Sequence, residues 1–156
     1  MNVSKQRGIK ATPESIWQAI STVESLPDWL AGVQSASHIS GPSEGVGRRQ
    51  RISRVIYQHD VEVEQEVTAW EPGRRMEVKH LRETSGGRDL QGVQDFLLTV
   101  TLSPAGQRTE VRVEYSWKAR AGVTWLLSVL FGGKTMGREL SDTLKKIEVL
   151  VKPRKA

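Results

Sequence analysis

The residues that could transfer protons in this chain are few and lie far apart in the sequence. The three histidines, His38, His59 and His80, fall in separate segments, and none of them neighbours a carboxylate in a pattern typical of acid–base catalysis. The sequence holds no cysteine, which excludes thiolate catalysis, disulfides and zinc–cysteine sites. No histidine–carboxylate spacing indicates a metal site, and there is no nucleophile elbow, P-loop or dinucleotide fingerprint. These motifs therefore predict no catalytic residue, no metal and no cofactor.

Three polar residues instead fall on faces of expected strands that are otherwise apolar. Gln65 interrupts an alternating face whose other members are Val61, Val63, Val67 and Ala69. His80 shares the parity of Met76 and Val78, so it either reaches the mouth of an interior site or is simply solvated at a strand end. A polar side chain on an inward face either bonds to its neighbours in the core or orients a bound molecule.

The direction of the third polar residue, Arg54, depends on the register of its strand. If Tyr57 pairs with Asp60 across a two-residue turn, the inward residues are Ile52, Arg54 and Ile56. If the link holds one more residue, the inward residues are Ser53, Val55 and Tyr57, because a one-residue slip exchanges the two faces of a strand. We favour the first register, since it buries two isoleucines. An inward arginine is costly to bury without a partner and would favour an acidic or carbonyl-bearing ligand.

The elements that must position these residues follow from the hydrophobic periodicity. Residues 2–10 form a weak polar strand, and Thr12-Pro13-Glu14 begins a helix with an N-cap, a proline at the first position and an acid in the first turn. Ser25 can cap a second short helix that ends at Gly32. The period then changes to two, which predicts strands over 33–40, 48–57, 60–70, 74–81, 94–102 and 109–117. Along 60–70 the face with Glu62, Glu64 and Glu66 is expected to be solvated.

The last segment, residues 122–151, is expected to be helical. Its apolar stripe consists of Leu140, Leu144, Ile147 and Val151. An antiparallel sheet has one apolar face to cover, and only this helix is long enough to cover it. The sequence therefore predicts an α+β fold, with a curved antiparallel sheet of about seven strands around a long C-terminal helix and two short helices after the first strand.

The N-terminal half of this segment, residues 123–131, is apolar nearly all round and is followed by Gly132-Gly133. It is too short to span a bilayer, which takes roughly 20 apolar residues. Three explanations stay open for its exposed side: a homodimer interface, a contact with a membrane surface or another partner, and a mobile gate hinged at the glycines.

Four stretches of the sequence resemble the START-like, helix-grip superfamily, also called SRPBCC, and in particular its polyketide cyclase/dehydrase-type members. They are ATPESIWQAISTVESLPDWLAGV (11–33), VGRRQRI (46–52), EQEVTAWEPGRRMEV (64–78) and GRELSDTLKKIEVLV (137–151). The resemblance covers essentially the whole chain and implies a START/Bet v-like fold. It also implies a deep, mostly apolar cavity between the sheet and the long helix, which members use for lipids, sterols, quinones, hormones or polyketides.

From the resemblance and the pattern together we expect a small hydrophobic ligand, such as a lipid, a quinone or a polyketide-like molecule. The expected ligand-binding residues are Trp29, Leu30, Val33, Ile52, Arg54, Ile56, Gln65, His80, Phe96, Leu98, Trp117, Leu127, Leu130, Met136 and Leu140. Trp29 either lines the cavity or packs the second helix onto the sheet, whereas Trp17 is expected to pack only. Two alternatives are a cyclase, aromatase or dehydratase acting on a polyketide, and a chaperone-like interaction module that uses residues 123–131.

Composition limits the remaining possibilities. The formal net charge is +5, but the basic residues are scattered and no reading helix or stacking platform accompanies them, so we expect no nucleic acid. No signal peptide is expected, and the absence of cysteine fits a reducing compartment, so we expect a cytoplasmic protein. No linker divides the chain, which predicts one ligand-binding domain over residues 1–156 with a basic tail at 152–156.

Overall fold

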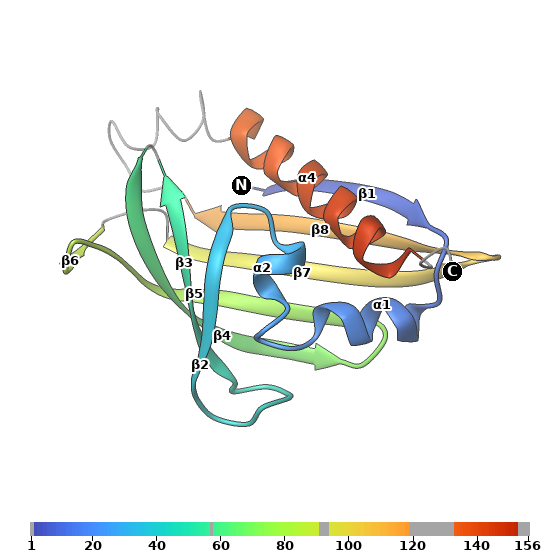
Figure 1. The fold of residues 1–156 in the computed structure, drawn as a ribbon, viewed down its shortest axis with the longest axis horizontal. Helices are drawn as coiled ribbons and strands as arrows, with labels where there is room; N and C mark the ends of the chain where they lie inside the picture. The colour runs from blue at the N-terminus through green and yellow to red at the C-terminus, as the bar shows by residue number, and fades with distance from the viewer. Residues whose placement is uncertain (1, 57, 91–93, 119–132, 153–156) are drawn as a thin grey trace.

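The chain forms one curved antiparallel sheet with a long helix across its concave side (Figure 1). This computed structural model describes residues 2–56, 58–90, 94–118 and 133–152. The strands are β1 (Asn2–Ile9), β2 (Val33–Ser40), β3 (Arg49–Ile56), β4 (His59–Glu71), β5 (Arg75–Ser85), β6 (Arg88–Asp89), β7 (Gln94–Ala105) and β8 (Arg108–Lys118). The helices are α1 (Pro13–Ile20), α2 (Leu26–Trp29) and α4 (Gly133–Val151). The order of the strands in the sheet is β1-β8-β7-β5-β4-β3-β2, with β6 paired to β5.

The predicted α+β, helix-grip fold is therefore confirmed. All seven expected strands are present, and β6 adds a two-residue strand in a segment expected to be a loop. None of the helices in the described parts of the chain is long and apolar enough to cross a membrane. The apolar run 123–131 and Gly132 lie outside the described residues, and so do residues 153–156 of the basic tail.

The two short helices begin in different ways. At α1 the predicted cap is present, since Thr12 Oγ1 accepts a hydrogen bond from the Ser15 backbone N–H at 3.1 Å. At α2 the expected cap is wrong, because Ser25 makes no side-chain cap bond. Pro27 has no N–H to offer, and the Asp28 N–H is bound by the Ser25 carbonyl at 2.8 Å. The Ser25 hydroxyl instead accepts from Trp29 Nε1 at 3.2 Å, which orients that indole.

The register of β3 on β4 differs from the favoured one, although the inward face is the expected one. Ile56 pairs with His59, whereas we expected Tyr57 to pair with Asp60. Moving both partners by one residue shifts the pairing by two, which preserves parity. Ile52 is consequently fully buried and Arg54 is largely buried.

Two β-bulges bend the β4–β5 pair, at Thr68 of β4 and at Leu81 of β5. The bulge at Thr68 interrupts the alternation of β4, so the expected inward position of Ala69 is wrong. Ala69 pairs with Glu77, and its neighbour Trp70 pairs with the buried Met76. Trp70 packs against the core and meets Trp17 edge-on, with ring centroids 5.0 Å apart.

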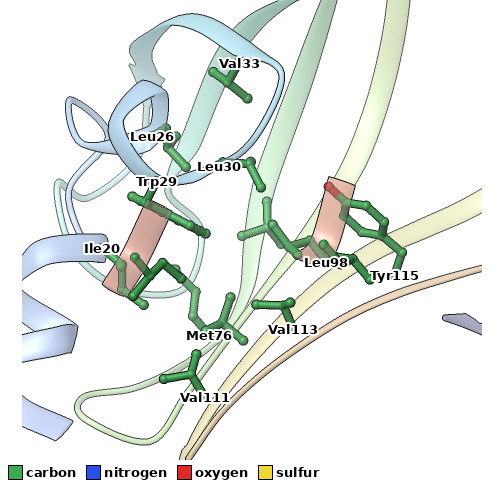
Figure 2. Packing of buried hydrophobic residues seen from close by; sticks show 14 of the residues in the cluster. Ile20, Leu26, Trp29, Leu30, Val33, Met76, Leu98, Val111, Val113 and Tyr115 are labelled. Carbon is green, nitrogen blue, oxygen red and sulfur yellow. The ribbon is translucent and has the colours of Figure 1, made fainter. Parts of the chain in front are cut away.

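The core lies between the concave face of the sheet and the helices. Figure 2 shows the side chains of Trp29, Met76 and Val113 in the space between α2 and the sheet, where they belong to one buried cluster. The apolar stripe of α4 is confirmed, with Leu140, Leu144 and Ile147 buried and Val151 half-buried. α4 is joined to the loop after α2 by the buried Thr143, whose hydroxyl accepts from the Ala31 N–H at 3.1 Å.

Candidate functional site

A row of polar side chains crosses three neighbouring strands on the concave face. Its members, which we call the polar row, are Arg48, Gln50, Gln65, His80 and Glu83. Gln50 pairs with Gln65 across β3 and β4, and Gln65 pairs with His80 across β4 and β5. Arg48, Gln50 and Gln65 are almost fully buried, so the row runs through the apolar core.

The hydrogen bonds of the polar row all point in one direction. Arg48 Nε donates to Gln50 Oε1 at 3.0 Å, and Gln50 Nε2 donates to Gln65 Oε1 at 2.9 Å. The Gln65 amide nitrogen is a donor, so the His80 Nε2 atom, 3.0 Å away, must accept. His80 therefore carries its proton on Nδ1 and donates it to Glu83 Oε1 at 3.2 Å. The row thus runs from a cationic donor to an anionic acceptor.

Burial keeps His80 in the neutral form that this direction of bonding requires. The His80 side chain is 9% exposed, and this burial lowers the pKa of its imidazole from the ordinary value. The hydrogen bond from His80 lowers the pKa of the Glu83 carboxyl, which stays ionised at neutral pH. Since both imidazole nitrogens are engaged, His80 offers no free lone pair to a substrate.

Arg48, at the other end of the row, is buried and forms no ion pair among the described residues, although the charges of Glu24 and Glu44 act on it. Its Nη1 atom donates to the backbone oxygens of Ser21, at 2.6 Å, and Ser43, at 3.3 Å. The guanidinium also lies over the Trp70 ring, 5.2 Å from the centroid. Burial lowers the pKa of Arg48. These bonds join Arg48, which precedes β3, to Ser21 after α1 and to Ser43 in the segment between β2 and β3.

A second polar group joins α4 to the sheet through an ion pair. Arg54 Nη2 of β3 donates to Glu139 Oε1 of α4, and the Tyr115 hydroxyl of β8 donates to the same oxygen at 2.8 Å. The side chains of Arg54 and Glu139 are only 14% and 18% exposed. Burial, and then the charge of Glu139, raise the pKa of Tyr115, so its hydroxyl remains a donor at all ordinary pH values. We call these three residues the Arg54 cluster.

Phe96 links the two polar groups. Its ring centroid lies 4.4 Å from that of His80 and 4.9 Å from that of Tyr115. The Trp117 ring stacks on Phe96 with a centroid distance of 6.4 Å. The interior beside α4 therefore combines an aromatic surface with a charged pair and a neutral histidine.

The structure brings most of the predicted site residues to this interior. Eleven side chains are buried or nearly so: Trp29, Leu30, Val33, Ile52, Arg54, Gln65, His80, Phe96, Leu98, Trp117 and Leu140. Met136 is half-buried against the same core. Leu127, Leu130 and the side chain of Ile56 lie outside the described residues. Trp29 is fully buried, and its indole is bonded to Ser25, so in this structure it packs α2 onto the core.

The sequence shows no histidine next to a carboxylate in a pattern typical of acid–base catalysis, yet the structure pairs His80 with Glu83. On a regular strand, His80 and Glu83 would point to opposite faces, because they are three residues apart. The bulge at Leu81 adds one residue between them, so both side chains reach the same face. Sequence reasoning also missed Gln50, Arg48, Tyr115 and Glu139. The parity of Gln50 with Ile52, and of Tyr115 with Val113, was the available signal.

The outer face of the sheet suits an apolar ligand poorly. One hollow there is lined by Gln6, Arg75, Thr99, Thr101, Ser103, Glu110, Arg112 and Glu114. Another lies between the charged side chains Arg51, Glu62, Glu64 and Arg82. In the described parts of the chain, no group of three or more histidine and acidic side chains is placed to hold a metal ion.

Comparisons with known proteins agree on family and fold. A family model described as polyketide cyclase / dehydrase and lipid transport matches residues 1–152. The crystal structure of TTHA0849 from Thermus thermophilus is similar with a TM-score of 0.77 and 21% identity over 97% of each chain. Major latex-like protein 151 from Panax ginseng is similar with a TM-score of 0.73 and 16% identity over 98% of each chain.

A third similar structure has a longer chain. DynU16, a protein in the dynemicin biosynthetic locus, matches with a TM-score of 0.65 and 15% identity, covering 95% of this chain and 46% of its own. At these identities the structures show a shared fold only. None of the curated proteins matches the sequence.

Proposed function

Since the chain belongs to the polyketide cyclase/dehydrase and lipid transport family, we propose that it binds a small hydrophobic molecule between the concave face of its sheet and α4. A lipid, a quinone or a polyketide-like compound fits the mainly apolar surroundings. Affinity comes from burying apolar surface, at about 25 cal/mol per Å² before the costs of binding. We place this binding in the cytoplasm, in keeping with a sequence that has no cysteine.

The Arg54 cluster is the observation that carries this proposal. A buried ion pair stabilises a fold little, because the cost of removing two charges from water offsets their attraction, and apolar side chains of similar size are often as good. This chain nevertheless places one where α4 meets the sheet, bonded to Tyr115, whose ring packs against Phe96. An apolar wall with a few buried polar groups is the usual composition of a small-molecule site.

Binding of a neutral fluorescent probe tests the proposal. The wild-type protein should bind N-phenyl-1-naphthylamine with a rise in emission. Met136→Trp enlarges a half-buried side chain packed against the core, whereas Thr135→Trp enlarges an exposed neighbour on the same helix. We expect Met136→Trp to weaken binding about tenfold, the effect of roughly 1.4 kcal/mol, and Thr135→Trp to leave it unchanged.

Thermal unfolding of both variants provides the check on folding. Absence of probe binding by the wild-type protein would refute the proposal. Equal affinities for the two tryptophan variants, with both folded, would show that the probe does not bind beside α4. Native mass spectrometry of the purified protein then identifies any hydrophobic compound that stays bound.

The His80–Glu83 pair favours a second candidate, an enzyme of the cyclase or dehydratase type. A histidine oriented by a carboxylate is a common general base. Here its second nitrogen is bound by Gln65, so catalysis requires that this amide move away. Conversion of a poly-β-ketone thioester by the wild-type protein, and its loss in His80→Gln, would support this candidate. Unchanged turnover in His80→Gln would exclude His80 as the base.

A further inference from the structure

We propose that the ligand carries an anionic oxygen on its apolar body, and that this oxygen takes the place of the Glu139 carboxylate between Arg54 and Tyr115. This inference rests on the binding function proposed above and specifies the chemistry of the polar end of the ligand. A carboxylate is the simplest group of this kind.

The geometry of the Arg54 cluster is that of a receptor for one oxygen. Two donors from distant strands, Arg54 Nη2 of β3 and the Tyr115 hydroxyl of β8, converge on a single atom, Glu139 Oε1. In the sheet β3 and β8 are separated by β4, β5 and β7, so the curvature of the sheet brings these donors to face one another. The Glu139 carboxylate therefore lies between the two sides of the interior in which we place the ligand.

The two donors are held by their surroundings, whereas the acceptor can be exchanged. Tyr115 is 2% exposed and packs against Phe96. The Arg54 guanidinium lies so close to Gly32 that a Cβ atom there would be 3.0 Å from Nη2. Glu139 comes from the early turns of α4, with a partly exposed side chain, so its carboxylate can rotate toward water.

Arg54 also has unused capacity for an anion. Its Nε atom is buried and has no hydrogen-bond partner among the described residues. Nε and Nη2 form one edge of the guanidinium, and a carboxylate fits such an edge with two parallel hydrogen bonds. Glu139 accepts from Nη2 only. A ligand carboxylate that accepts from both atoms would satisfy the buried donor that Glu139 leaves unpaired.

Charge balance favours an anion over a neutral polar group. When Glu139 leaves, Arg54 loses its only ion-pair partner among the described residues, although the more distant Glu83 still interacts with its charge. A ligand anion restores the pair, whereas an alcohol leaves a largely buried cation without a bonded counter-charge, which is costly. Removal of the Glu139 charge should therefore help an anionic ligand and affect a neutral ligand little.

The test compares dodecanoate with dodecan-1-ol as competitors for bound N-phenyl-1-naphthylamine at pH 8. We expect wild-type protein to prefer dodecanoate, and Glu139→Gln to raise dodecanoate affinity about tenfold, the scale of one charge-assisted hydrogen bond. Tyr115→Phe should lower dodecanoate affinity by a similar factor and leave that of dodecan-1-ol unchanged. Glu148→Gln is the matched control, since Glu148 lies on the same helix but pairs with the exposed Arg7.

The outcomes separate this inference from the proposed function. If the probe binds and both competitors displace it equally, in wild type and in Glu139→Gln, the ligand site is real and the anion inference is wrong. If Arg54→Gln is folded and still prefers dodecanoate, the inference is also wrong. If no probe binds to the wild-type protein, the proposed function itself fails. A preference for dodecanoate that disappears in Arg54→Gln and grows in Glu139→Gln establishes the inference.

Discussion

Replacing the two central glutamines of the polar row by leucine should show strong non-additivity. Gln65→Leu leaves two buried atoms without a partner, Gln50 Nε2 and His80 Nε2. Gln50→Leu also leaves two, Arg48 Nε and Gln65 Oε1. The double substitution again leaves only two, Arg48 Nε and His80 Nε2, because it removes both atoms of the bond between the glutamines.

The magnitude follows from this number of unpaired atoms. A buried polar group without a partner costs about 1–3 kcal/mol, so each single variant should lose roughly 2–6 kcal/mol of unfolding free energy, less the gain from the added apolar surface. Each leucine adds its own gain, and the double variant has both gains, so these terms cancel in the double-mutant cycle. The double variant should lose no more than one single variant. The coupling free energy between Gln50 and Gln65 should be about 2–3 kcal/mol, because this is where the estimate of roughly 2–6 kcal/mol overlaps the usual range for contacting residues.

Equilibrium urea unfolding at neutral pH measures the four free energies. Gln65→Leu combined with Thr143→Val is the control, because Thr143 bonds to Ala31 and shares no partner with Gln65. That control pair should be additive within about 0.5 kcal/mol. If the Gln50 and Gln65 substitutions are additive to the same precision, the two amides are not coupled and the polar row is not a continuous chain of hydrogen bonds.

Three further predictions concern stability. Burial lowers the pKa of His80, so the unfolded chain binds more protons than the folded protein at mildly acidic pH. The contribution of the neutral His80 to the free energy of unfolding should be fully present above the ordinary pKa of 6.5 and decrease as the pH falls below it. Urea midpoints from pH 7.5 to 5 measure this decrease, which should be smaller in His80→Gln. Gly41→Ala places a Cβ atom 2.2 Å from the Gly47 carbonyl oxygen at a φ of +78°. It should destabilise the fold clearly more than Gly106→Ala, where the space is open and only the left-handed conformation of alanine costs free energy, about 1–2 kcal/mol. Similar urea midpoints for the two variants would contradict this prediction. Trp29→Ala should cost about 3–5 kcal/mol because Trp29 is fully buried, whereas Val149→Ala at a 71% exposed position should stay within about 0.5 kcal/mol; thermal and urea unfolding would show the contrast or its absence.

Features determined by local sequence were predictable, and these include the inward polar residues. The Thr12 cap and the stripe of Leu140, Leu144 and Ile147 depend on spacings within one element. Gln65 and Arg54 could be placed inward because the alternation of their strands is regular around them. The exact pairing of β3 with β4 was wrong by two positions, since parity alone does not distinguish registers that differ by two.

The contacts that make the candidate site depend on irregularities and curvature that no local spacing reveals. The bulge at Leu81 adds one residue to β5 without a glycine to mark it, so the His80–Glu83 pair was hidden. Glu139 is a charged residue beside an apolar stripe, which usually means exposure to solvent. Its partner Arg54 lies in a distant part of the sequence, and the two meet only because the sheet curves around α4.

The pairing of β1 with β8 determines the order in which the chain can fold during synthesis. From β2 to β5, and from β7 to β8, each strand pairs with the next in the chain, so these hairpins can form as they emerge. β1 is synthesised before β8, and Val3 can pair with Tyr115 only after Tyr115 has been added to the chain. Synthesis adds about 5–20 residues per second. The edge of β1 that later pairs with β8 is therefore exposed for several seconds, long enough to pair with another chain. The charges of Lys5 and Arg7 oppose such pairing, so the polar character of this strand protects the nascent protein from aggregation.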